Sequence, residues 1–144
     1  MKRFLSVFLA VAVFSAIGFV ALADRNISSN ELPKEAKAFI NKHYNGASIY
    51  ECEIDNKEYN VELSNGVDLE FNNKGKLIKI DADHGVIAQS VLKAILPAKA
   101  LQYLNGKGLA DRVDEVEFLR NTIVVDINNS RDHEIRFNLD GSVK

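Results

Sequence analysis

The side chains able to do chemistry in this sequence are mainly carboxylates that alternate with apolar residues along short stretches. In YECEID, residues 50–55, Glu51 and Glu53 alternate with Tyr50, Cys52 and Ile54. A surface that gathers many carboxylates and few cations attracts a basic partner. The candidate partner-binding residues are Glu51, Glu53, Glu62, Glu70, Glu115 and Glu117, with Asp68, Asp126 and Glu134 beside them.

Cys52 is the only cysteine, which excludes an intramolecular disulfide. It shares the phase of Tyr50 and Ile54 in an alternating stretch. A nucleophilic thiolate needs an accessible, electropositive place, whereas a free cysteine usually packs as a small apolar side chain. We therefore predict that Cys52 lies in the core, on the same strand face as Tyr50 and Ile54.

The histidines, His43, His84 and His133, are too far apart in the sequence for an i, i+4 pair of metal ligands. One local cluster remains in DADH, where Asp81, Asp83 and His84 could meet a cation. The segment lacks the regular ligand spacing and the closing glutamate of a calcium loop. A solvated turn is therefore favoured over a metal site.

Enzyme motifs are missing from the sequence. It has no catalytic spacing of Ser, His and Asp, no phosphate-binding glycine loop and no HExxH zinc motif. We expect no catalytic residues, no enzyme activity and no cofactor.

The first 23 residues have the form of a secretory signal peptide. Lys2 and Arg3 precede an apolar run from Phe4 to Val20, and Ala21-Leu22-Ala23 is a cleavage site of small residues. The alternative is an uncleaved membrane anchor. We expect cleavage after Ala23, export to the periplasm or beyond the cell, and one domain over residues 24–144.

The charge of the mature chain limits its partners. Cleavage removes Lys2 and Arg3 and leaves 16 Lys and Arg against 20 Asp and Glu, a net charge of −4. A mildly acidic chain without a basic cluster argues against binding nucleic acid or an anionic membrane surface.

One motif occurs twice. ELPKEAKAFI (31–40) matches ILPAKALQYL (95–104) at an offset of 64, and the offset becomes 66 where Phe71 and Gly75 match Phe137 and Gly141. The two extra residues fall in NNSRD (128–132), which locates a hairpin loop there. The domain is therefore predicted to contain two repeats, about 31–81 and 95–144.

Each repeat is predicted to be a helix followed by a meander of strands. Pro33 and Pro97 suit helix starts, and apolar residues then recur at period two with turns at 55–57, 64–66 and around Gly75. A short bridging helix is expected over 85–94. The fold class is α+β, one antiparallel sheet of about eight strands with helices on one face.

The polar face of this sheet has two interpretations. A sheet covered on one side must place polar residues on the other, so a merely solvated face is the simpler one. However, like charges on adjacent strands are destabilising, and only Lys79, Arg136 and Arg120 offset the carboxylates. A docking surface is the second interpretation.

The sequence also resembles a known family. ELPKEAKAFINKHY, followed by a strand and then by YNVELSNGVDLEFNNKGKLIKID, is similar to the PepSY-like, β-lactamase-inhibitor-like proteins exported by Bacteroidetes. The second repeat is looser, because Ile123 replaces the strand tyrosine and Ser130 the turn glycine. The resemblance implies helices on the convex face of a curved antiparallel sheet. Its concave face corresponds to the one with which the namesake inhibitor grips its enzyme.

These features favour an exported, non-enzymatic binding module, inhibitor-like or otherwise, that takes a protein or peptide on the acidic sheet face. The alternative is a periplasmic carrier of a small ligand or cation, using the DADH turn or a cleft between the repeats. Shape alone does not transfer inhibition from the namesake.

Overall fold

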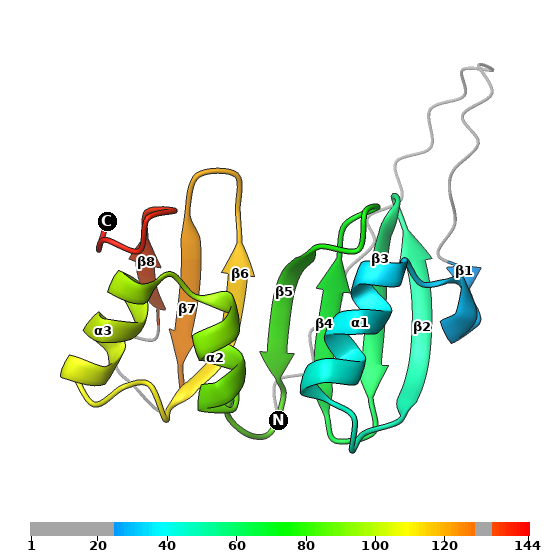
Figure 1. Cartoon of the computed structure of the whole chain (residues 1–144), viewed down its shortest axis with the longest axis horizontal. Coiled ribbons are helices and arrows are strands. Elements are labelled where there is room, and N and C mark those ends of the chain that lie inside the picture. The colour runs from blue at the N-terminus through cyan, green and yellow to red at the C-terminus, as the bar shows by residue number, and fades with distance from the viewer. Residues whose placement is uncertain (1–24, 129–133) are drawn as a thin grey trace, which may run out of the picture.

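Eight antiparallel strands form one sheet in which each strand pairs with its neighbours in sequence, in the order β1 to β8. A computed structural model describes residues 25–128 and 134–144. All three α-helices lie on the same face of the sheet, as Figure 1 shows, and the other face is uncovered by helices. The predicted fold class is confirmed.

The element bounds follow the two repeats. The first comprises α1 (Lys34–His43), β2 (Ile49–Asp55), β3 (Glu58–Leu63), β4 (Val67–Phe71) and β5 (Leu77–Ala82). The second comprises α3 (Ala98–Gly106), β6 (Val113–Phe118), β7 (Ile123–Ile127) and β8 (Glu134–Phe137). Before them come β1 (Arg25–Asn26) and the short 3₁₀ helix η1 (Ser29–Glu31), and α2 (Gln89–Ile95) joins the repeats.

The duplicated Leu-Pro and Gly motifs contact each other in three dimensions. Pro33 and Pro97 immediately precede α1 and α3, and their carbonyls accept the first hydrogen bonds of each helix. Gly75 approaches the start of α1 so closely that a Cβ there would lie 2.8 Å from the Pro33 Cβ. A Cβ on Gly141 would lie 2.8 Å from the Cβ of Pro97. The repeated motif is therefore one docking contact between a turn and a helix start.

Aromatic packing repeats in the same way. Phe39 on α1 packs edge-on against Phe71, with ring centroids 5.9 Å apart. Tyr103 on α3 packs edge-on against Phe137, with centroids 5.7 Å apart. The helices α1 and α3 thus pack against the sheet at equivalent points. The buried residues of both repeats form one continuous core.

The strand phases place the apolar residues as predicted except at one position. Cys52, Val61 and Leu69 face the helices and are buried, which confirms the core prediction for Cys52. The prediction for Tyr50 is wrong, because its side chain is 75 % exposed. The pairing shifts by one residue between Ile49 and Glu51, and such a bulge releases the extra residue from the alternation.

Three further details differ from the sequence expectation. The bridging helix α2 begins at Gln89, four residues later than predicted. Residues 85–88 are non-helical, and the N-cap residue, Ala88, makes no side-chain capping hydrogen bond. The two residues of β1 add an unexpected strand beside β2. In the second repeat, the counterpart of β5 is reduced to a single bridge between Phe137 and Val143. The predicted loop in NNSRD lies largely outside the described residues.

Candidate functional site

Seven carboxylates face one another in a continuous line across β2 to β8. The strand register pairs Glu51 with Glu62, Glu62 with Asp68 and so on to Glu134. We call this line the acidic row; its members are Glu51, Glu62, Asp68, Asp81, Glu115, Asp126 and Glu134. Directly opposed residues have Cβ atoms about 4.5–5.5 Å apart, so each step of the row places two like charges side by side.

The row is nearly symmetric about Asp81. Glu51, Glu62 and Asp68 come from the first repeat, and their counterparts Glu115, Asp126 and Glu134 come from the second. Asp81 lies between them at the junction, opposite Asp68 on β4 and Glu115 on β6. Both repeats carry the same bulge, between Ile49 and Glu51 and between Val113 and Glu115, and the equivalent bulges keep the two halves of the row in register.

A second line beside the acidic row is mixed in character. It comprises Asn26, Glu53, Asn60, Glu70, Lys79, Glu117, Val124 and Arg136. The Lys79 Nζ lies 3.1 Å from the Glu115 Oε1, and Arg136 pairs with Glu134. The rest of the acidic row has no ion-pair partner among the described residues. Two cations therefore offset seven carboxylates.

Burial and mutual repulsion change the protonation of the row. Partial burial, the charges of Glu115 and Asp83 and a hydrogen bond with Glu115 raise the pKa of Asp81 to about 6, although Lys79 opposes the shift. Burial also raises the pKa of Asp68 and of Asp126, and neighbouring carboxylates add to both shifts. For Lys79, burial acts to lower the pKa, but Glu115, Glu70 and Asp81 outweigh it, so its pKa is raised. The carboxylates of Asp68, Asp81 and Asp126 therefore take up a proton at a higher pH than an ordinary aspartate does.

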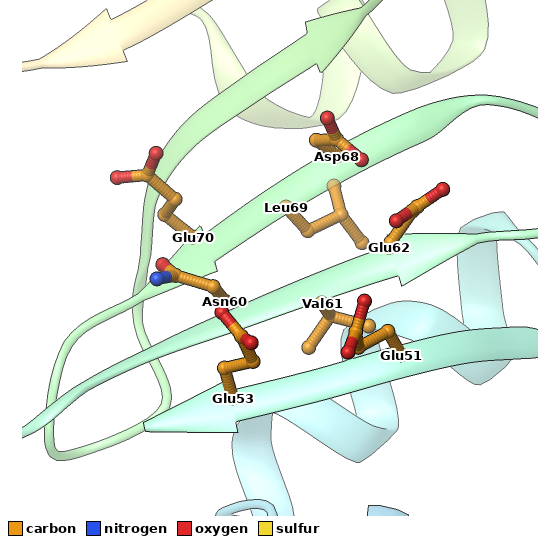
Figure 2. Close-up of a pocket in the computed structure, with 8 residues that line it drawn as sticks. All are labelled: Glu51, Glu53, Asn60, Val61, Glu62, Asp68, Leu69 and Glu70. Atoms are coloured by element: carbon orange, nitrogen blue, oxygen red, sulfur yellow. The ribbon is translucent and has the colours of Figure 1, made fainter. Parts of the chain in front are cut away.

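A shallow hollow of about 200 Å³ lies over β2, β3 and β4 on this face. Figure 2 shows the carboxylates of Glu51, Glu53, Glu62 and Glu70 on one side of the ribbon, while Leu69 points to the other. The residues that line the hollow are Glu51, Glu53, Asn60, Val61, Glu62, Asp68, Leu69 and Glu70. Four of the six predicted partner-binding residues are therefore brought together here.

The other two predicted residues, Glu115 and Glu117, lie further along the same face on β6. Glu115 belongs to the acidic row and Glu117 to the mixed line, opposite Lys79 on β5. All six residues thus share one face of the sheet. The strand register links them, and they do not surround a single cavity.

The DADH segment divides between two environments. Asp81 belongs to β5 and to the acidic row, whereas Asp83 and His84 lie in the turn that follows, with the His84 side chain 91 % exposed. The His84 Nε2 is 3.9 Å from the Asp83 Oδ2. Within residues 25–128 and 134–144, no group of three or more His, Cys, Asp or Glu side chains is arranged to hold a metal ion.

Sequence reasoning missed the central position of Asp81 in the acidic row. It assigned this residue to a turn, because the alternation in LIKIDADH does not show where the strand ends. The pattern of Lys79 and Asp81 at period two, in phase with the carboxylates of other strands, was the available signal. Only the pairing of β5 with β6 reveals that Asp81 connects the two repeats.

An antiparallel sheet with helices on one face and carboxylates across the other defines an open-faced α+β protein. The model of the family described as "Putative beta-lactamase-inhibitor-like, PepSY-like" matches residues 20–79 and again residues 86–144. The chain belongs to this family, and the two matches coincide with its two repeats.

Solved structures share the fold. A Bacteroides vulgatus protein, described as a "putative periplasmic protein of unknown function", is 23% identical with a TM-score of 0.70, over 84% of this chain and 96% of that one. A Bacteroides thetaiotaomicron protein, described as a "putative calcium-regulated periplasmic protein", is 23% identical with a TM-score of 0.72, over 84% and 94%. At these identities the likeness establishes the fold alone.

No curated protein matches the chain. In the part of the chain that the structure describes, none of the helices has the length and apolarity to cross a membrane. The predicted signal peptide, residues 1–23, lies outside the described residues.

Proposed function

We propose that this chain is an exported, non-enzymatic binding module that takes a basic protein or peptide segment along the acidic row. The observation that carries the proposal is the register, in which seven carboxylates oppose one another across seven strands. Export is supported by the amino-terminal sequence and by the periplasmic descriptions of the structural relatives.

Electrostatic repulsion between the carboxylates of the acidic row gives a physical reason for binding a basic partner. Each directly opposed pair of like charges opposes folding by roughly 0.2–1 kcal/mol, and within residues 25–128 and 134–144 only the ion pairs of Lys79 and Arg136 offset part of this repulsion. A partner that places lysine or arginine side chains over the row removes this repulsion on binding. Such attraction between exposed charges accelerates association and weakens as salt screens it.

The width of the row suits an extended segment. It crosses seven strands, and neighbouring strands in a sheet lie about 4.8 Å apart. A basic peptide laid across the strands could therefore contact both repeats together. The absence of tryptophan from the sequence limits the aromatic anchors that dominate tight interfaces, so we expect binding that is mainly electrostatic.

The test uses a lysine-rich decapeptide, with a glutamate-rich decapeptide of the same length as a negative control. The row variant replaces Glu62→Gln and Asp126→Asn, equivalent positions that have no ion-pair partner among the described residues. The matched control, Glu35→Gln with Asp111→Asn, changes the charge equally at exposed sites off the row. We expect the row variant to weaken binding about two- to tenfold and to reduce its salt dependence.

Equal binding by the row variant and the matched control would overturn the proposal and leave a solvated sheet face. A calcium titration separates the competing carrier hypothesis, which the description of the Bacteroides thetaiotaomicron protein raises. If calcium raises the melting temperature of the wild type and the row variant loses this effect, while the basic peptide does not bind, the row is a cation site instead.

A further inference from the structure

A groove on the helix-covered side of the sheet, opposite the acidic row, runs between the two repeats. It has a volume of about 450 Å³. In Figure 1, β5 lies between α1 and α2, which cover the strands on either side of it. The lining residues come from both repeats; they are Phe39, Lys76, Leu77, Ala94, Ile95, Pro97, Phe118, Ile123 and Leu139.

The groove is lined mainly by apolar side chains. Leu77 and Ile123 are buried beneath it, Ile95 and Phe118 are half buried, and Leu139 on the rim is 54 % exposed. Sites for small molecules are typically about 300–1,000 Å³ and are lined mainly by apolar and aromatic side chains. The size and lining therefore fit one small ligand with an apolar body.

The charge on the helix-covered side of the sheet determines whether an anionic or a cationic ligand is favoured there. Lys76 is the one charged residue in the lining, its side chain is exposed, and it has no ion-pair partner among the described residues. The α-helices add to the positive potential, because α1, α2 and α3 carry five lysines and a single acidic residue, Glu35, although one of the five, Lys99, pairs with Asp140 at 2.6 Å. The lysines are Lys34, Lys37, Lys42, Lys93 and Lys99. An anionic head group is favoured on this side and disfavoured on the opposite one.

We propose that the groove between the repeats binds a free aliphatic carboxylate, with its chain over Leu77 and Ile123 and its head group at Lys76. The site is separate from the acidic row and does not depend on the proposed function. It needs both repeats, because α1 and β5 supply one wall while Ile95, Phe118 and Leu139 supply the other.

The first experiment titrates the intact mature protein with dodecanoate and follows methyl NMR signals. We expect saturable shifts at Leu77, Ile95, Ile123 and Leu139, and none at Leu63, which lies in the first repeat outside the groove. Octanoate and decanoate should bind more weakly, by up to about fourfold for each missing methylene. Dodecanol and dodecyltrimethylammonium separate the contribution of the head group.

Two pairs of variants locate the site. Lys76→Glu should weaken dodecanoate about two- to fivefold or more, whereas Lys74→Glu, in the same exposed turn but outside the lining, should not. Ala94→Trp should fill the groove and lower the affinity at least about tenfold. Ala38→Trp, exposed on α1 and outside the lining, is its control.

The proposal is overturned if dodecanoate does not saturate or if Lys76→Glu and Ala94→Trp bind like their controls. Dodecyltrimethylammonium binding as tightly as dodecanoate would also overturn it, since Lys76 would then not select the head group. Sedimentation with anionic phospholipid vesicles, without saturable binding of free dodecanoate, would show a membrane-facing surface in place of the groove site.

Discussion

At the scale of single residues, Asp81 is the position where the two repeats meet electrostatically. It opposes Asp68 and Glu115 from different repeats, and its pKa of about 6 lies above the usual 3.8. The folded state therefore binds more protons than the unfolded state between these values. Protonation of Asp81 therefore stabilises the folded state relative to high pH. This stabilisation is complete below pH 4 and is lost as the pH rises through 6.

We predict that the melting temperature rises as the pH falls from about 7.5 to about 5. The raised pKa values of Asp68, Glu70 and Asp126 act in the same direction. Asp81→Asn should stabilise the protein at pH 7.5 by on the order of 1 kcal/mol, after allowance for solvent screening, and should flatten the pH profile. Asp111→Asn, exposed and off the row, should leave the profile unchanged. A profile that Asp81→Asn does not alter would contradict the assignment.

Cys52 supports a second prediction at this scale. Its side chain is 3 % exposed and burial raises the pKa of the thiol, so we expect a thiol reagent to label the folded protein slowly and the unfolded protein fast. The control places a cysteine at the neighbouring bulge, as Tyr50→Cys in a Cys52→Val background. Because Tyr50 is 75 % exposed, the control should label quickly without denaturant. Fast labelling of native Cys52 would show that the strand faces are misassigned.

At the scale of elements, the contact between a glycine turn and a helix start recurs in both repeats. Gly75 and Gly141 have φ angles of 81° and 85°, a region that costs other residues roughly 1–2 kcal/mol. Each glycine also touches the backbone at the beginning of a helix, since an added Cβ would lie 2.9 Å from Ala36 N or 2.8 Å from Ala100 N. The turn positions the helix over the sheet.

We predict that Gly75→Ala and Gly141→Ala each lower the free energy of unfolding by about 2–4 kcal/mol, from backbone strain and steric overlap together. Gly66→Ala is the matched control: its φ is 78°, but nothing lies within 4 Å of the added Cβ. The control should lose only about 1 kcal/mol. Urea unfolding measures all three, and equal losses would show that the helix contact contributes nothing.

At the scale of the whole molecule, the repeats share one sheet and one core. The β5–β6 pairing joins Lys79 to Glu117, Ile80 to Val116 and Asp81 to Glu115, and Ile80 is fully buried at this seam. Charge is also divided at this scale, with carboxylates on the open face and lysines on the helices. We therefore expect the two proposed sites to attract ligands of opposite charge.

We predict that residues 24–81 expressed alone are unfolded or self-associate. Without β6, the β5 edge loses its hydrogen-bond partner and Ile80 loses its cover, and an open edge of this kind pairs readily with another chain. Circular dichroism and sedimentation velocity measure the outcome, with residues 24–144 as the control. A monomeric half that melts cooperatively would contradict the single-sheet architecture.

Much of the fold was predictable from the sequence, because its signals are local. Strand side chains alternate between faces at period two, so the alternation of Val61, Leu63 and Leu69 with carboxylates separates the core face from the polar face. Turn glycines and the two Leu-Pro motifs mark where elements begin and end, and the internal match reveals two repeats. These properties depend on neighbours along the chain, and the structure reproduces them.

The tertiary structure alone decided the strand register and the helix positions, and with them the acidic row and the groove. The bulge at Tyr50 changes the phase of β2 without any turn signal in the sequence, and the pairing of β5 with β6 puts Asp81 into the row. The apolar groove exists only because α1 and α2 stand apart on either side of β5. Strand pairing and helix docking join residues far apart in the chain, and their free energies depend on contacts that local sequence patterns do not contain.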